Sequence, residues 1–476
     1  MAATVLPSHS PGRQIITNAG ALAIGGIAAQ AAFLFVEAMI ARKLGVHAYG
    51  TFSAMYTAML LIVLAIDLGM TWKLIELGAR DANAIPVNLG TMLCLKALLC
   101  VVIYPLALAV LALSDAEPGV LELFAIFAAF GVLLLVQESL AAAYTAIRRN
   151  WFNALFQASV PLIIALAVAV VVLPRPSLNR TAWAYVLGSA IPTAIWAWLA
   201  IRRFAPRVDV TKFKETLRGS YLYGINALLS YSSFKTGMLV LMVFSTRTEV
   251  AFFAAAFKLV ELGYKVPIVV NRVVAPHLFA DSQHQPETFP ALCEGLLRGA
   301  ATLSALASFV LIVLGSELIH LIFGHEYEEA ALLLQILGVA LGLKTFGLIA
   351  QSVVTSAGRL EFRTRALAAS ITFGVVVSVP LVIQWGARGA AIGVLVADVT
   401  MLIALVWALR TVLLLGRVLV TVVAPIVTVA ATLLVANRLS MSAAYAAAFG
   451  IAIIVAILFA SGYLRPALRL ASRGRR

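Results

Sequence analysis

Fourteen long apolar segments constrain the fold of this chain more than any other feature. Of its 476 residues, 62% are hydrophobic and only 12% are charged, a composition that soluble globular domains of this size do not have. A segment of about 20 apolar residues can cross a bilayer as a helix. We therefore predict an all-α polytopic membrane protein with about 14 transmembrane helices. The predicted segments are 15–41, 47–69, 87–113, 119–147, 150–173, 181–203, 217–246, 249–280, 290–314, 327–355, 363–384, 388–413, 416–437 and 441–464.

The charged residues between these segments predict the orientation. If successive loops alternate between the two sides, Lys and Arg favour the side of the N-terminus by about three to one. Because positive charge is enriched in cytoplasmic loops, we expect both termini to be cytoplasmic. The net charge of +14 is mainly this topological bias. The cations are dispersed over many loops, which argues against a nucleic-acid partner, and the basic loops are expected to meet membrane lipid.

Four charged residues lie in the interior of the predicted segment 249–280: Lys258, Glu261, Lys265 and Arg272. At 3.6 residues per turn they fall within an arc of roughly 60° and form a line about 21 Å long. A charge at bilayer depth costs about 3 kcal/mol or more, so such side chains normally face a bundle interior or a wet cavity. Three of the four are cations, and Lys235 lies near the middle of segment 217–246. This pattern favours an anionic cargo, best a phosphate head group, bound by Lys235, Lys258, Lys265 and Arg272.

Several carboxylates also lie within the apolar segments, where they could balance these cations or bind a coupling H⁺ or Na⁺. They are Glu37, Asp67, Glu138, Glu261 and Asp398. Structural alternatives exist for most of them. Glu261 has the spacing for local pairing with Lys258 and Lys265. Asp67 is near the end of its segment, and Glu138 and Asp398 could hydrogen-bond to a neighbouring helix.

The two halves of the chain share short patterns in the same order. Asn18-Ala19 corresponds to Asn226-Ala227, and Arg180-Thr181-Ala182 corresponds to Arg388-Gly389-Ala390. Six segments separate the copies, so both copies insert in the same sense. Parallel repeats of this kind are a transporter architecture, with the site at the repeat interface. We predict six-helix lobes at 1–203 and 204–413, followed by two additional helices and a basic tail at 414–476.

The sequence contains no motif that indicates an enzyme. It has no H-E-x-x-H, P-loop or nucleophile-elbow pattern. Cys94, Cys100 and Cys293 are not spaced as metal ligands and are interpreted as small core hydrophobes. His320 and His325 fall in an expected loop. We predict a transporter with no cofactor other than a coupling H⁺ or Na⁺.

Three local patterns resemble a known family. Residues 41–45 (Ala-Arg-Lys-Leu-Gly), followed by Tyr49-Gly50 and Phe52-Ser53, resemble the first loop of bacterial polysaccharide flippases. Phe323-Gly324, with Tyr327 and Leu334 to Leu337, resembles their loop into helix ten, and 387–393 resembles the start of their helix twelve. The chain is thus similar to the polysaccharide and O-antigen flippases of the multidrug/oligosaccharidyl-lipid/polysaccharide exporter superfamily.

This resemblance implies two six-helix lobes in a V around a central cavity, with two extra C-terminal helices, in the bacterial inner membrane. It implies that undecaprenyl-diphosphate-linked oligosaccharide, a repeat unit of O-antigen, capsule or exopolysaccharide, moves from the cytoplasmic to the periplasmic leaflet by alternating access. A polysaccharide polymerase or glycosyltransferase would then be a partner. Lipid II flippases carry arginines in the first helix, whereas segment 15–41 has no cation, which disfavours lipid II as cargo.

Two other functions stay open on the sequence alone. One is an ion-coupled multidrug or cation antiporter of the same superfamily, which needs a cavity of acidic character. The cationic line in segment 249–280 argues against it. The other is a non-transporting membrane scaffold of a polysaccharide-assembly complex, which has no need of charges at bilayer depth.

Overall fold

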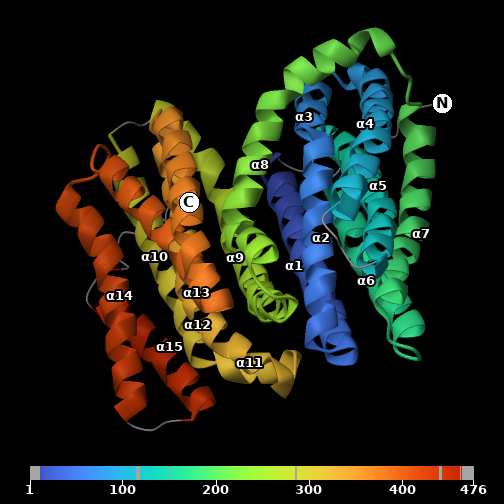
Figure 1. Cartoon of the computed structure of the whole chain (residues 1–476). Helices are drawn as coiled ribbons and strands as arrows, with labels where there is room; N and C mark the ends of the chain where they lie inside the picture. The colour runs from blue at the N-terminus through green and yellow to red at the C-terminus, as the bar shows by residue number, and fades with distance from the viewer. Residues whose placement is uncertain are drawn as a thin grey trace. The chain divides into compact units, whose positions relative to one another are not determined.

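The computed structural model describes residues 11–113, 118–147, 150–284, 287–438, 442–460 and 463. Within these residues the chain forms fifteen α-helices and three 3-10 turns, and no strand occurs among them (Figure 1). The helices are α1 (Pro11–Leu44), α2 (Val46–Asp67), α3 (Met70–Arg80), α4 (Ile85–Leu113), α5 (Pro118–Ala146), α6 (Asn150–Val172), α7 (Leu178–Phe204), α8 (Phe213–Phe244), α9 (Arg247–His284), α10 (Phe289–Val313), α11 (Gly315–Ile322), α12 (Glu329–Ser356), α13 (Leu360–Leu409), α14 (Leu415–Arg438) and α15 (Ala443–Ala460).

The predicted apolar segments correspond to the long helices. The one difference is α13, which covers both 363–384 and 388–413 and bends at Gly386. Gly386 has φ 54° and ψ −129°, a backbone conformation that glycine adopts without a Cβ penalty. If the two halves of α13 are counted separately, the described chain has the predicted fourteen long helices. Ten helices of the described part are long and apolar enough to cross a membrane, so this is a multi-pass membrane protein.

Two short helices were not predicted. Helix α3 follows a turn at Leu68-Gly69, and the Asp67 carboxylate accepts hydrogen bonds from the Gly69 and Thr71 backbone N–H groups at 3.1 and 3.3 Å. Helix α3 also carries Glu76. Hydrogen bonds donated by Lys73 and Tyr223 stabilise the Glu76 carboxylate anion and therefore lower its pKa. The prediction that His320 lies in a loop is wrong, because it belongs to α11.

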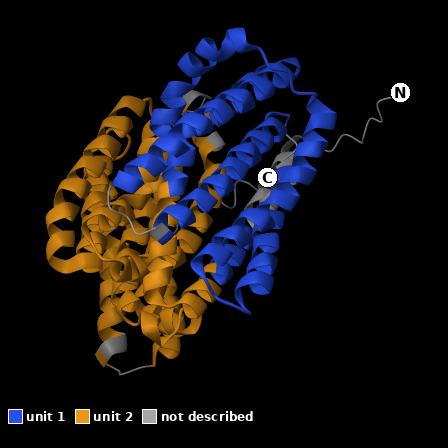
Figure 2. Cartoon of the chain, turned by 45° about the vertical axis from the view of Figure 1, so that its right-hand side comes forward, with its two compact units in different colours: residues 1–36, 59–227 blue, residues 37–58, 228–476 orange. Residues whose placement is uncertain are grey.

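The chain divides into two compact units (Figure 2). Unit 1 comprises Met1–Val36 and Met59–Ala227, and unit 2 comprises Glu37–Ala58 and Leu228–Arg476. Helices α1, α2 and α8 therefore contribute to both units. The division into lobes at 203 and 413 stays a prediction. What matters for the site is that the tip of the α1–α2 hairpin packs with the helices of unit 2.

Each unit has a core of its own. In unit 1, the Trp196 ring packs edge-on against Tyr144 and Phe156, with ring centres 6.0 and 5.1 Å apart. In unit 2, α9, α10, α12 and α13 enclose a cluster that includes Leu278, Cys293 and Leu405, each fully buried. Cys293 is thus a core side chain in this structure. These packed helices fix the direction in which α9 presents its charged face.

Candidate functional site

Four charged side chains of unit 2 form an alternating group, the ion quartet, made of Glu37, Lys258, Glu261 and Lys235. The Lys258 ammonium lies 2.6 Å from Glu37 Oε1 and 3.1 Å from Glu261 Oε2. The other Glu261 oxygen, Oε1, pairs with the Lys235 ammonium. The side chains are between 4% and 14% exposed. The quartet has two positive and two negative charges, so it places no net charge in the helix bundle.

Three helices position the quartet. Glu37 comes from α1, Lys235 from α8, and Lys258 and Glu261 from successive turns of α9. The Tyr49 hydroxyl on α2 donates a hydrogen bond to Glu37 Oε2 at 2.9 Å, so both oxygens of this carboxylate have a partner. The Lys235 ammonium also lies 4.6 Å from the centre of the Phe257 ring, a distance at which a ring face attracts a cation.

The space beside the quartet is small. A cavity of about 20 Å³ is lined by the quartet residues Glu37, Lys235 and Lys258 together with Ser53 and Tyr56. One water needs a cavity of roughly 10–15 Å³, so nothing as large as a diphosphate fits there in this conformation. Two of the lysines predicted to bind cargo, Lys235 and Lys258, are engaged by carboxylates, and cargo reaches them only if these pairs separate.

The other two predicted cations lie further along α9. Lys265 is half-buried and Arg272 is exposed. Within the described part of the chain, neither forms an ion pair with a carboxylate. With 100° per residue, both lie on the same side of α9 as Lys258 and Glu261. This face therefore starts with a neutral quartet and continues with two cations that form no ion pair within the described residues.

The remaining predicted carboxylates belong to other groups. In unit 1, Asp67 pairs with Lys96 at 2.5 Å, and Lys96 also donates to Thr71 Oγ1 and Ser139 Oγ at 3.0 and 2.7 Å. This network is buried and locks the α2–α3 turn against α4 and α5. Glu138 is exposed on α5, within electrostatic range of Lys96.

Asp398 has a different partner in unit 2. Its Oδ1 accepts a hydrogen bond from the Lys344 ammonium at 2.7 Å, and both side chains are about 10% exposed. The structure thus pairs the two mid-segment lysines that had no predicted role, Lys96 and Lys344, with carboxylates of their own unit. It does not bring Asp398 into the quartet. None of these positions tests a role in ion coupling, which stays a prediction.

Two of the sequence patterns that carry the family resemblance meet at the tip of the α1–α2 hairpin. The Arg42 guanidinium donates to the backbone carbonyl groups of His320 and Leu321, and the Tyr327 hydroxyl donates to the Ala41 carbonyl at 3.2 Å. The rings of Tyr49 and Tyr327 lie 6.0 Å apart. The sequence pattern alone does not show that these residues join the hairpin to α11 and to the segment before α12.

A glycine of the first pattern explains how closely these helices approach. A Cβ at Gly50 of α2 would lie 1.8 Å from the Arg247 carbonyl oxygen at the start of α9. Only a residue without a Cβ allows this contact. The same contact brings α2, which carries Tyr49, against the N-terminal end of α9, eleven residues before Lys258.

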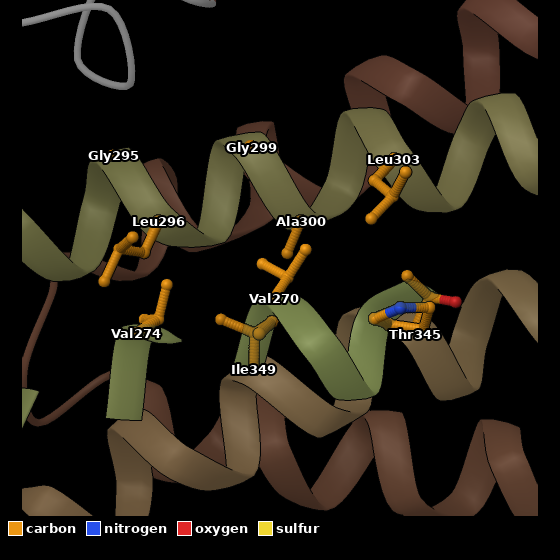
Figure 3. Close-up of a pocket in the computed structure, with 10 residues that line it drawn as sticks. Val270, Val274, Gly295, Leu296, Gly299, Ala300, Leu303, Thr345 and Ile349 are labelled. Carbon is orange, nitrogen blue, oxygen red and sulfur yellow. The ribbon is translucent and has the colours of Figure 1, made fainter. Parts of the chain in front are cut away.

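Unit 2 also contains an apolar cavity of about 270 Å³ between α9, α10 and α12 (Figure 3). It is lined by Pro267, Val270 and Val274 of α9 and by residues such as Leu296 and Ile349. By the 100° rotation per residue, these α9 positions lie about 180° from the charged line. The cavity is therefore separate from the ion quartet and from Lys265 and Arg272.

No metal site is evident in the described residues, since no three His, Cys, Asp or Glu side chains gather there. The arrangement on α9 can hold an anion near Lys265 and Arg272 by charge-assisted hydrogen bonds. It can also exchange the partners of Lys235 and Lys258. Such an exchange is an electrostatic event and involves no covalent chemistry.

Comparisons with known proteins agree with this architecture. A family model described as a polysaccharide biosynthesis protein matches residues 39–332. No curated protein sequence matches the chain. Among solved structures, the lipid II flippase MurJ in an inward closed conformation has a TM-score of 0.77 and 11% identity, covering 92% of this chain and 99% of that one.

Transporters of the MATE family have the same fold. An inward-facing multidrug resistance MATE transporter of the MOP superfamily has a TM-score of 0.67 and 15% identity, covering 82% of this chain and 96% of its own. The bent form of the Vibrio cholerae MATE transporter VcmN has a TM-score of 0.54 and 16% identity, with coverages of 86% and 98%. At these identities the likeness concerns the fold.

Proposed function

Because the chain belongs to the polysaccharide biosynthesis protein family, within the superfamily of MOP exporters, we propose that it is a flippase for undecaprenyl-diphosphate-linked oligosaccharide. The cargo would be a repeat unit of O-antigen, capsule or exopolysaccharide. The observation that carries this proposal is the cationic end of the α9 face, where Lys265 and Arg272 have no described counter-charge. A diphosphate supplies that charge, and a cationic drug does not.

The quartet provides a second step in the proposed mechanism. The diphosphate first meets Lys265 and Arg272, about 10–20 Å along α9 from Lys258. It then competes with Glu37 and Glu261 for the two quartet lysines. When the diphosphate replaces the carboxylates, the link from α1 to α9 through Glu37 is lost, which weakens the contact between the hairpin tip and the other helices of unit 2. Protonation of a carboxylate, or a bound Na⁺, would favour the same exchange.

Release of cargo follows from the same chemistry. Strong binding of a diphosphate in a low-dielectric site would trap it, because cations and phosphate attract strongly there. When Glu37 and Glu261 pair again with their lysines, they displace the anion and close the small cavity. The sugars would occupy a wet interior and the polyprenyl tail would stay in lipid. A polymerase or glycosyltransferase would supply or accept the cargo.

The proposed flippase would lie in the bacterial inner membrane. The Lys and Arg distribution indicates that both of its termini are cytoplasmic. Reporter fusions after Arg247 and Glu326 should be active in the periplasm, and a fusion after Arg207 should be active in the cytoplasm. Alkaline phosphatase and a cytoplasmic fluorescent reporter measure the two sides. The opposite pattern would show that the protein is inserted with its termini on the periplasmic side and that the proposed orientation is wrong.

Deleting the gene tests the function. We expect the surface polysaccharide to disappear and lipid-linked repeat units to accumulate on the cytoplasmic leaflet, where added periplasmic glycosidase does not reach them. Composition of the accumulated lipid would identify the sugar. Lysis without any loss of surface polysaccharide would point instead to lipid II as cargo.

The fold shared with MATE transporters is also compatible with one alternative function, that of an ion-coupled multidrug or cation antiporter. This alternative predicts that the deletion strain becomes sensitive to cationic dyes and retains its surface polysaccharide. A membrane scaffold of a polysaccharide-assembly complex predicts a third result. The deletion strain would lose its polysaccharide, and a variant whose α9 cations are all neutralised would restore it.

A further inference from the structure

Unit 2 has a third cavity, of about 480 Å³, where α9 and α12 begin and where α13 bends. In the proposed orientation all three places lie on the periplasmic side. The cavity is lined by the charged residues Glu249, Glu329 and Arg388, by Trp385, and by a set of apolar side chains. The apolar set is Phe252, Leu332, Leu333, Ile336 and Ile392.

The charges in this cavity are opposite in sign but not paired with one another. Within the described residues, Arg388 forms no ion pair with Glu249 or Glu329, and both Arg388 and Glu329 are exposed. Glu249 uses one oxygen to accept a hydrogen bond from the Ala387 backbone N–H at 2.6 Å. That bond fixes the carboxylate at the Gly386 bend. A group that carries both a cation and an anion can bridge the two sides of the cavity.

The apolar lining extends deeper than the charges. Ile336 lies seven residues after Glu329 on α12, about 10 Å further along the helix. Trp385 is 55% exposed and the neighbouring Ile383 is 65% exposed. Exposed apolar side chains on a membrane helix contact acyl chains, and tryptophan is enriched at the level of the head groups. The charged part of the cavity therefore matches head-group depth and the apolar part matches the start of the hydrocarbon.

We propose that this cavity binds one aminophospholipid from the periplasmic leaflet. Its phosphodiester accepts hydrogen bonds from Arg388, its primary ammonium donates to Glu329 and Glu249, and one acyl chain lies along Leu332, Ile336 and Ile392. Charge-assisted hydrogen bonds of this kind are the stronger ones in proteins. The two carboxylates disfavour a purely anionic lipid or the diphosphate of the cargo, so this site is distinct from the cationic end of the α9 face. It rests on the proposed orientation and not on the proposed cargo.

The test uses the full-length protein in detergent, titrated with three lipids of identical acyl chains and read by native mass spectrometry. Phosphatidylethanolamine should bind at least about tenfold more tightly than phosphatidylglycerol, which has no cation, and than phosphatidylcholine, whose quaternary ammonium has no N–H to donate. Phosphoethanolamine without chains should not compete. Equal binding of the three lipids would overturn the proposal, as would displacement of phosphatidylethanolamine by free oligosaccharide.

Matched variants locate the site. Arg388→Gln and Glu329→Gln should each weaken phosphatidylethanolamine binding about tenfold or more, because each removes a charge-assisted hydrogen bond to the head group. Glu328→Gln, one residue away and absent from the cavity lining, should leave binding unchanged, and so should Arg180→Gln in unit 1. Ile336→Trp, which fills the apolar part without changing charge, should also reduce binding. Unchanged affinity in the first two variants, with unchanged melting temperature, would place the lipid elsewhere.

Discussion

Replacing Lys265 and Arg272 by glutamine together is expected to lower the affinity for undecaprenyl diphosphate about 100-fold or more and to abolish surface polysaccharide. Each residue would lose a charge-assisted hydrogen bond to the diphosphate, of about 1.5–3 kcal/mol, and every 1.4 kcal/mol is tenfold in affinity. Neither cation pairs with a described carboxylate, so their removal leaves no buried charge without a partner. The protein should therefore insert and melt as the wild type does.

The measurement has two parts. Binding of undecaprenyl diphosphate to the purified protein gives the affinity, and immunoblots give the surface polysaccharide and the amount of protein in the membrane. The charge-conserving pair Lys265→Arg and Arg272→Lys should retain most of the activity. Arg365→Gln, which removes an exposed cation at the start of α13, should have no effect. Wild-type export by the double glutamine variant would show that this part of α9 does not contact cargo, and dye efflux by the wild type would favour the antiporter.

The long helices could be predicted from the sequence because each one needs only a local signal, an apolar run of membrane length. The bend at Gly386 is local too, since the predicted segments 363–384 and 388–413 already stop on either side of Trp385-Gly386-Ala387. Helices α3 and α11 escaped prediction for the opposite reason. Their eleven and eight residues are too short to give a signal beside the long apolar segments.

The site was predictable in part. The 3.6-residue period places Lys258, Glu261, Lys265 and Arg272 on one face, and the local pairing of Glu261 with Lys258 follows from their spacing. The partners Glu37 and Lys235 lie on other helices, and no single-sequence pattern connects them with α9. The sequence alone therefore overestimates the positive charge on the charged face of α9. The structure shows a neutral quartet followed by two cations, and this changes which residues we expect to meet the cargo first.

Replacing Lys258 by methionine is expected to destabilise the protein by about 3–5 kcal/mol, because it leaves a buried carboxylate without its counter-charge. Glu37 is 4% exposed at its side chain and would retain only the hydrogen bond from Tyr49. Glu261 would keep Lys235. For a protein of this size the loss corresponds to a fall of about 5 °C or more in melting temperature. Thermal unfolding of the purified protein in one detergent and at one scan rate measures the change.

A double-mutant cycle separates the ion pair from other effects of the substitution. Glu37→Gln combined with Lys258→Met removes both charges, so the double variant should recover most of the lost stability, with a coupling energy of about 2 kcal/mol or more between the two sites. Arg365→Met breaks an ion pair whose side chains are 82% and 88% exposed, and such pairs contribute little, so its melting temperature should barely change. Additive effects of the Glu37 and Lys258 substitutions would show that the pair is not formed in the membrane protein.

The same double variant distinguishes a structural role of the quartet from a role in transport. If Lys258 only neutralises Glu37, the stable double variant should export polysaccharide at the wild-type rate. The exchange mechanism requires more, because the cargo must displace Glu37 from Lys258 and later be displaced by it. It therefore predicts a protein that is as stable as the wild type, binds undecaprenyl diphosphate at Lys265 and Arg272, and fails to complete export. Retained binding with lost export in a well-folded variant is a result that a purely structural ion pair does not produce.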